Sequence, residues 1–130
     1  MYYKRKIDTV LDGWLKKENK SPALVIGIRQ CGKTETIREF AKRNNLKLIE
    51  LNFWTNSKLC SDFEGSLDVD TIISNISLRF PDLKINPSNA LIFFDEIQVS
   101  ERAITSLKYF CESDKPYKIV CAGSLLGVKI

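Results

Sequence analysis

Four blocks of the chain carry apolar residues every three or four positions, with polar residues between them. This spacing predicts amphipathic helices over residues 6–17, 33–43, 69–80 and 101–112. Trp14 falls on the apolar face of the first helix, so we expect it to pack into the core.

Four shorter blocks are almost entirely apolar and predict strands over residues 23–26, 46–53, 90–94 and 117–122. An uninterrupted apolar run is typical of a strand buried on both faces, as in a parallel sheet. Strands and helices alternate along the chain, so the expected fold class is α/β, with three layers and helices on both faces of a parallel sheet. Residues 54–65 are rich in polar, turn-forming residues and predict a loop.

Local signals predict where the helices end and which residues face inward. Asn44 and Asn45 are expected to end the second helix, because Asn tolerates the left-handed backbone conformation. Ser100 is expected to cap the last helix. The residues expected to face the core from that helix are Ile104, Leu107, Phe110 and Cys111.

The composition predicts one globular domain over residues 1–130, with 44% hydrophobic and 28% charged residues. A net charge of +4 is too small to indicate nucleic-acid binding by itself. The sequence has neither a membrane-length apolar run nor a signal peptide, so we expect a cytoplasmic protein that does not contact membranes. With no histidine and no C-x-x-C pair, a zinc site is not expected, and Cys111 and Cys121 are interpreted as small core residues.

The segment Gly27–Thr34 matches the pattern G-x-x-x-x-G-K-[ST], which is typical of a phosphate-binding loop. Its glycines let the backbone curl so that N–H groups point at an anion, and the next helix directs its positive end to the same place. In such a loop Lys33 reaches the β- and γ-phosphates, and the Thr34 hydroxyl ligates Mg²⁺. The predicted nucleotide-binding residues are Gly27, Ile28, Arg29, Gln30, Cys31, Gly32, Lys33 and Thr34.

The third predicted strand ends in two carboxylates, Asp95 and Glu96. Ligands of open α/β sheets bind at the carboxyl ends of the strands, so Asp95 is expected beside the loop that follows the first strand. We predict that Asp95 holds Mg²⁺ through a water molecule and that Glu96 orients or deprotonates the attacking water. An acidic pair at a strand end is more often a solvated edge, and it is the phosphate-binding pattern that favours the catalytic interpretation.

Other polar residues near this edge have two interpretations each. Ser124 follows Gly123 at the end of the fourth strand, where it either contacts the γ-phosphate or forms a plain turn. Arg29 either contacts phosphate or pairs with an acidic neighbour, and Cys31 is either a reactive thiol or, preferably, a small loop residue. Gln98 is either a relay to a partner or a surface residue. The predicted catalytic set is Lys33, Glu96 and Ser124.

These motifs together resemble a family of AAA-type P-loop ATPases that is widespread in bacteria and archaea. The likeness rests on the segments 4–7, 27–34, 94–98 (with "DEIQ"), 106–110 and 122–127, and it covers nearly the whole chain. The resemblance implies ATP and Mg²⁺ as cofactors, Asp95 and Glu96 as the Walker B carboxylates, and Ser124 as a first sensor. The choice of ATP over GTP follows from the resemblance alone.

The resemblance also implies parts that are not found in these 130 residues, namely a fifth strand, a helical lid and a C-terminal domain. The implied sheet order is 5-1-4-3-2, so residues 1–130 are expected to be a truncated, N-terminal part of an AAA-type ATP-binding domain. The strand over residues 23–26 would then be an apolar sheet edge, and such edges tend to pair with other chains. We therefore expect either a fragment of a longer protein or self-association through that edge.

Three functions fit the sequence. The first is Mg²⁺-dependent ATP hydrolysis. The resemblance implies an arginine finger after the fourth strand, which these 130 residues do not supply. Because such a finger contributes roughly 10³–10⁵ in rate, hydrolysis by the isolated chain is expected to be slow. The second is a nucleotide-binding switch or assembly module without turnover. The third, a nucleotide kinase or other phosphotransferase, requires an arginine-rich lid, whereas the arginines here are scattered. The sequence leaves open whether the partner is a nucleic acid or a protein.

Overall fold

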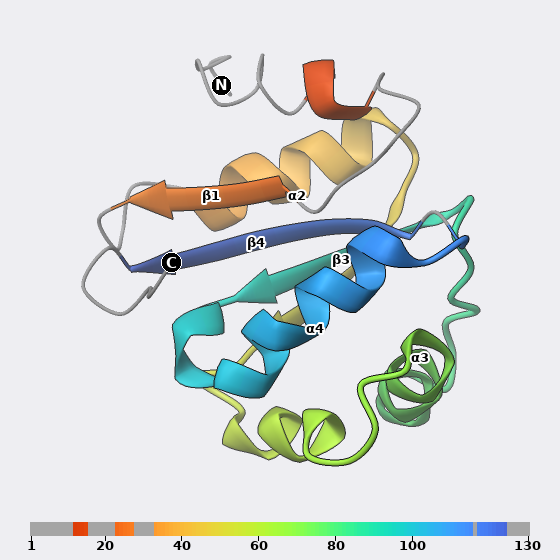
Figure 1. Cartoon of the computed structure of the whole chain (residues 1–130). Helices are drawn as coiled ribbons and strands as arrows, with labels where there is room; N and C mark the ends of the chain where they lie inside the picture. Colours follow the sequence, from red (N-terminus) through yellow and green to blue (C-terminus); the bar gives the residue numbers. More distant parts are fainter. Residues whose placement is uncertain (1–11, 16–22, 28–32, 116, 125–130) are drawn as a thin grey trace.

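The sheet contains four parallel strands in the part of the chain that the structure describes. This computed structural model describes residues 12–15, 23–27, 33–115 and 117–124. The strands are β1 (Ala23–Gly27), β2 (Lys47–Asn52), β3 (Ala90–Asp95) and β4 (Lys118–Ser124). They lie in the order β1-β4-β3-β2, which agrees with the order implied by the resemblance (Figure 1).

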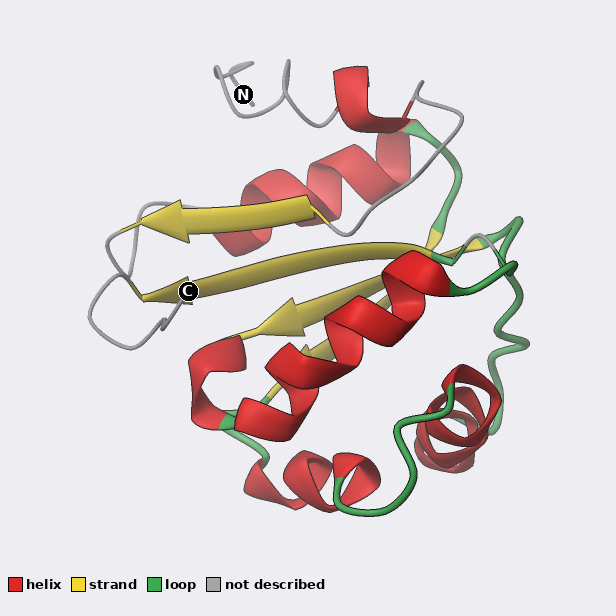
Figure 2. Cartoon of the chain, viewed as in Figure 1, coloured by secondary structure: helices red, strands yellow, loops and turns green. Residues whose placement is uncertain are grey.

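The helices alternate with the strands as the periodicity predicts. They are α2 (Lys33–Arg43), α3 (Val69–Arg79) and α4 (Glu101–Glu112). Two 3₁₀ helices are present as well, η1 (Ser57–Phe63) between β2 and α3 and η2 (Ile97–Val99) between β3 and α4 (Figure 2). Residues 12–15 are helical, and the rest of the helix predicted over 6–17 lies outside the described residues.

Helices pack on both faces of the sheet, which confirms the predicted three-layer α/β class (Figure 1). Because side chains alternate along a strand, β3 contributes Ile92 and Phe94 to one core cluster and Leu91 and Phe93 to the other. The cluster with Leu91 and Phe93 is closed by α2 and by Trp14, which is buried as predicted. The opposite cluster is closed by η1, α3 and α4.

Aromatic side chains pack around the carboxyl end of β3. The Phe94 ring makes edge-to-face contacts with Phe53, Phe63 and Phe110, at centroid distances of 5.9, 5.6 and 6.1 Å. Edge-to-face aromatic pairs stabilise a fold by more than the burial of their apolar area alone. They hold the backbone on the N-terminal side of Asp95, the next residue in β3.

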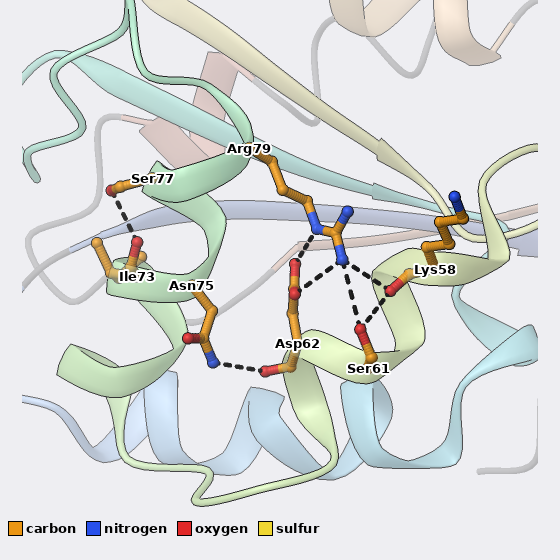
Figure 3. A network of polar contacts seen from close by, with 7 residues as sticks. All are labelled: Lys58, Ser61, Asp62, Ile73, Asn75, Ser77 and Arg79. Atoms are coloured by element: carbon orange, nitrogen blue, oxygen red, sulfur yellow. Dashed lines mark hydrogen bonds and ion pairs between the residues drawn. The ribbon is translucent and has the colours of Figure 1, made fainter.

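The prediction of a loop over residues 54–65 is wrong for residues 57–63, which form η1. Leu59 and Phe63 are buried, and Cys60, three positions before Phe63 and therefore on the same face of a 3₁₀ helix, packs against the core. The side chain of Arg79 on α3 fixes the other side by pairing with Asp62 (Figure 3). The sequence pattern indicates a loop here because polar residues outnumber the buried apolar residues of the segment.

The prediction that Cys111 is a core residue is also wrong, because its side chain is exposed. The buried positions of α4 are Ala103, Ser106 and Phe110, and Cys111 is about 100° further round the helix than Phe110. Ser106 can face the core because its hydroxyl donates to the carbonyl of Ala103, at 2.6 Å. Cys121, in contrast, is fully buried in β4, as predicted.

The predicted helix ends are confirmed. The Ser100 hydroxyl accepts a hydrogen bond from the backbone N–H of Ala103 at 3.0 Å, which caps α4. Asn45, just after α2, has a left-handed backbone with φ 54°. Within the described ranges, no helix is long and apolar enough to cross a membrane.

Candidate functional site

The carboxyl ends of all four strands meet at one edge of the sheet, because the strands are parallel. The register pairs Gly27 with Ser124 across β1 and β4, and Asn52 with Asp95 across β2 and β3. The phosphate-binding pattern starts at Gly27, and α2 begins at Lys33, so the pattern connects this edge to a helix N-terminus. That is the arrangement in which backbone N–H groups and a helix dipole favour an anion.

The two predicted metal-binding residues are in contact. The Thr34 hydroxyl donates to Asp95 Oδ2 at 3.3 Å, although the residues are 61 positions apart. Thr34 lies in the first turn of α2 and Asp95 is the last residue of β3, and both side chains are half-buried. The fold therefore places the end of the phosphate-binding pattern against the strand-end carboxylate.

Asn52 also contacts Asp95 and was not among the predicted site residues. Its Nδ2 donates to Asp95 Oδ2 at 3.3 Å. Its Oδ1 accepts hydrogen bonds from the backbone N–H groups of Trp54 and Thr55, at 2.9 and 3.0 Å. The available signal was a polar residue ending the second apolar strand, at the same sheet edge as Asp95.

Glu96, the predicted catalytic base, has an unusual backbone. Its φ of 54° and ψ of 45° are left-handed, a conformation that costs a residue with a Cβ about 1–2 kcal/mol. The Glu96 side chain is half-buried, and its Oε1 accepts a hydrogen bond of 3.5 Å from Gln98 Nε2. Gln98 thus lies beside the acidic pair, and both interpretations of this residue stay predictions.

A positive charge lies close to the acidic edge. Arg38, one helical turn after Thr34, pairs with Glu50 of β2, and Arg38 Nη2 lies 3.0 Å from Glu50 Oε2. The hydrogen bond to Glu50, with the charge of Glu50, raises the pKa of Arg38 above its ordinary value, and the charge of Asp95 adds a smaller contribution. Arg38 is therefore within electrostatic reach of Asp95 and remains charged.

The donor set fits Mg²⁺ better than a metal held by protein alone. The described residues include no group of three His, Cys, Asp or Glu side chains that could hold a metal ion. Mg²⁺ commonly uses only one or two protein oxygens and completes its shell with water and substrate phosphates. The Thr34 hydroxyl and the Asp95 carboxylate, which are in contact here, are oxygen donors of this kind.

Several predicted site residues cannot be placed. Residues 28–32, which include Ile28, Arg29, Gln30, Cys31 and Gly32, lie outside the described residues. Lys33 begins α2, and Ser124 ends β4 in register with Gly27. Those backbone positions are at the expected edge, and the roles of the three residues stay predictions.

Comparison with known protein families finds a match over residues 19–129 to a family described as an AAA domain. This range includes the complete phosphate-binding pattern, the acidic pair and all four strands. A comparison with curated proteins finds no match.

Proposed function

Because this chain belongs to the AAA domain family, we propose that it binds ATP with Mg²⁺ at the carboxyl edge of its sheet and hydrolyses the γ-phosphate. Family membership supports nucleotide binding by an AAA-type module, and ATP hydrolysis is the further step that we propose. The observation that carries the proposal is the contact between the Thr34 hydroxyl and Asp95 Oδ2, at 3.3 Å.

The proposed roles follow from position and chemistry. The backbone N–H groups of Gly27–Thr34 surround the phosphates, and Lys33 contacts the β- and γ-phosphates. Thr34 and Asp95 hold Mg²⁺, which when bound neutralises charge that develops on the phosphate oxygens. Glu96, beside Asp95, orients the attacking water and takes its proton. Ser124, at the end of β4, contacts the γ-phosphate or its water.

The first experiment tests binding. Calorimetry with Mg²⁺ and either ATP or GTP should show binding by the wild-type protein, with ATP favoured. Lys33→Ala should weaken it strongly, because the loop loses its charged contact to the terminal phosphates. Lys42→Ala is the matched control, since Lys42 is exposed in the last turn of the same helix. Equal affinities for Lys33→Ala and the wild-type protein would contradict the proposal.

The second experiment separates hydrolysis from simple binding. Phosphate release by the wild-type protein, reduced in Glu96→Gln with ATP binding retained, supports hydrolysis with Glu96 as the base. Binding without phosphate release, even at high protein concentration, favours the switch or assembly module instead. Transfer of phosphate to a second nucleotide would indicate a phosphotransferase.

A further inference from the structure

Asn52 joins three segments at the carboxyl edge of the sheet. It is the last residue of β2, its register partner is Asp95 of β3, and its side chain lies over the turn that follows β2. The side chain is half-buried, and both ends of its amide are hydrogen-bonded. Only the contact with Asp95 reaches the candidate metal-binding pair.

The orientation of the Asn52 amide follows from its neighbours. Two backbone N–H groups, from Trp54 and Thr55, lie 2.9 and 3.0 Å from Oδ1. An amide nitrogen cannot accept hydrogen bonds, so the atom facing these N–H groups must be the oxygen. The NH₂ group is thereby directed at the carboxylate of Asp95.

The carboxylate of Asp95 is held from two sides. Asp95 Oδ2 accepts from Thr34 of α2 and from Asn52 of β2, each at 3.3 Å. The two donors come from different elements, because Thr34 lies in the first turn of α2 and Asn52 is the last residue of β2, the strand next to β3. Rotation of the carboxylate away from Thr34 would break the hydrogen bond to Asn52.

We propose that Asn52 is a positioning residue that fixes the Asp95 carboxylate for the Mg²⁺–nucleotide complex. The inference rests on the proposed function, because it concerns how the same site takes up its metal. Groups that hydrogen-bond to a metal-binding side chain fix its orientation, and their loss typically costs about 10–100-fold in metal affinity or activity. Asn52 has this relation to Asp95, and among the described residues it contacts the candidate metal-binding pair through Asp95 alone.

Asn52 also stabilises the turn after β2, and the test must separate the two roles. Asn52→Ser keeps a side-chain oxygen that can accept from the turn N–H groups, since Ser forms similar turns more weakly than Asn. Its hydroxyl is too short to reach Asp95. Asn52→Ala removes both roles. Asn56→Ala is the matched control, because Asn56 lies in the same turn and its side chain makes no capping hydrogen bond.

The experiment measures ATP affinity by calorimetry in Mg²⁺ and in EDTA, and the ratio of the two affinities is the metal-dependent gain. We expect Asn52→Ser and Asn52→Ala to lower this gain about tenfold, while ATP affinity in EDTA stays unchanged. Asn56→Ala should retain the wild-type gain. Thermal unfolding of each variant reports the turn role separately, and we expect a smaller loss of stability for Asn52→Ser than for Asn52→Ala.

The outcomes are distinguishable. A wild-type gain in both Asn52 variants overturns the inference and leaves Asn52 as a turn residue, whatever the change in thermal stability. An equal loss of ATP affinity in Mg²⁺ and in EDTA also overturns it, because the defect would then not involve the metal. Absence of ATP binding by the wild-type protein overturns the proposed function, and the inference with it.

Discussion

At the scale of single residues, Glu96 combines a proposed catalytic role with a strained backbone. Its φ of 54° matches that of Asn45, and these are the non-glycine residues with positive φ in the described part of the chain. Asn adopts this conformation several-fold more often than most other non-glycine residues, Glu included. Strain of this kind tends to occur at functional sites, where the surrounding structure holds it in place. Here the aromatic contacts of Phe94 fix the backbone before Glu96, and the start of η2 fixes the backbone after it.

The strain at Glu96 can be measured with two substitutions. Glu96→Gly and Glu96→Ala both remove the carboxylate, but only glycine adopts positive φ without a Cβ clash. We expect Glu96→Gly to be more stable than Glu96→Ala by about 1 kcal/mol, from urea unfolding. The same pair of changes at Asn45 provides a reference for a position after a helix. Equal stabilities of the two Glu96 variants would show that the backbone there is not strained.

The sequence predicted the contact of Thr34 with Asp95 because both belong to patterns with a fixed place in a parallel α/β fold. It did not predict Asn52, because an asparagine at a strand end has many structural uses and only the register with Asp95 distinguishes this one. The left-handed backbone of Glu96 was also not predictable, since the residue type opposes it.

At the scale of elements, one ion pair joins η1 to the end of α3. Arg79 pairs with Asp62 and also donates to the carbonyl of Lys58 at 2.9 Å (Figure 3). Asn75, one turn earlier on α3, donates to the carbonyl of Asp62 at 3.2 Å. Asp62 is almost fully buried, and its hydrogen bond raises the pKa of Arg79 above the ordinary value. The ion pair with Arg79 compensates for burying the Asp62 carboxylate, and the two hydrogen bonds to backbone carbonyls attach η1 to α3.

Removal of Arg79 should show how much burial of the Asp62 carboxylate lowers the free energy of unfolding when its partner is absent. Arg79→Ala leaves the Asp62 carboxylate without its charged donor, and we expect a loss of about 1.5–3 kcal/mol in urea unfolding. Lys115→Ala is the control, because Lys115 pairs with Asp70 at a fully exposed position and should leave the midpoint unchanged. Equal effects of the two changes would mean that the contact between Arg79 and Asp62 contributes no more than a surface pair.

The long elements were predictable because their apolar residues are strongly periodic or continuous, and their observed bounds agree with the expected ones to within about two residues. Periodicity failed where a polar residue faces the core. Ser106 is buried on α4 because its hydroxyl donates to a carbonyl of its own helix. A pattern that counts only apolar residues passes over Ser106 and places the core-facing side of α4 too close to Cys111. Likewise, η1 is too short for its two apolar anchors to outweigh its polar residues.

At the scale of the whole molecule, the described sheet has two edges of different character. On the β2 edge, Lys47 is exposed and Glu50 is paired with Arg38. Charges of this kind discourage pairing with another chain. The sequence of β1, Ala-Leu-Val-Ile-Gly, is uncharged, and β1 pairs on one side with β4.

Among the described strands β1 pairs with β4 alone, and we propose that a second copy of this chain pairs with the other side of β1. Sedimentation of the purified chain over a wide range of concentration should show association, because unpaired backbone groups on an apolar edge favour strand addition. Hydrogen exchange should then show the amide protons of β1 becoming more protected as the concentration rises, with those of β2 as the internal control. A chain that remains monomeric at the highest concentration would contradict self-association.

Alkylation of the buried thiol of Cys121 can measure how nucleotide binding changes the stability of the whole fold. Cys121 lies in β4, between β1 and β3, and burial raises the pKa of its thiol far above the ordinary value. The reactive thiolate therefore forms only when the sheet opens, so alkylation of Cys121 reports opening. A ligand that binds only the folded state stabilises it by about 2.7 kcal/mol at about 100 times its Kd, so ATP with Mg²⁺ should slow Cys121 alkylation about 100-fold.

Exposed Cys111 is the internal control and should react at the same rate with and without nucleotide. Both alkylation rates can be followed by mass spectrometry of the peptides. A Cys121 rate that does not change with nucleotide, in a protein that calorimetry shows to bind ATP, would mean that the thiol is reached by local opening of the sheet.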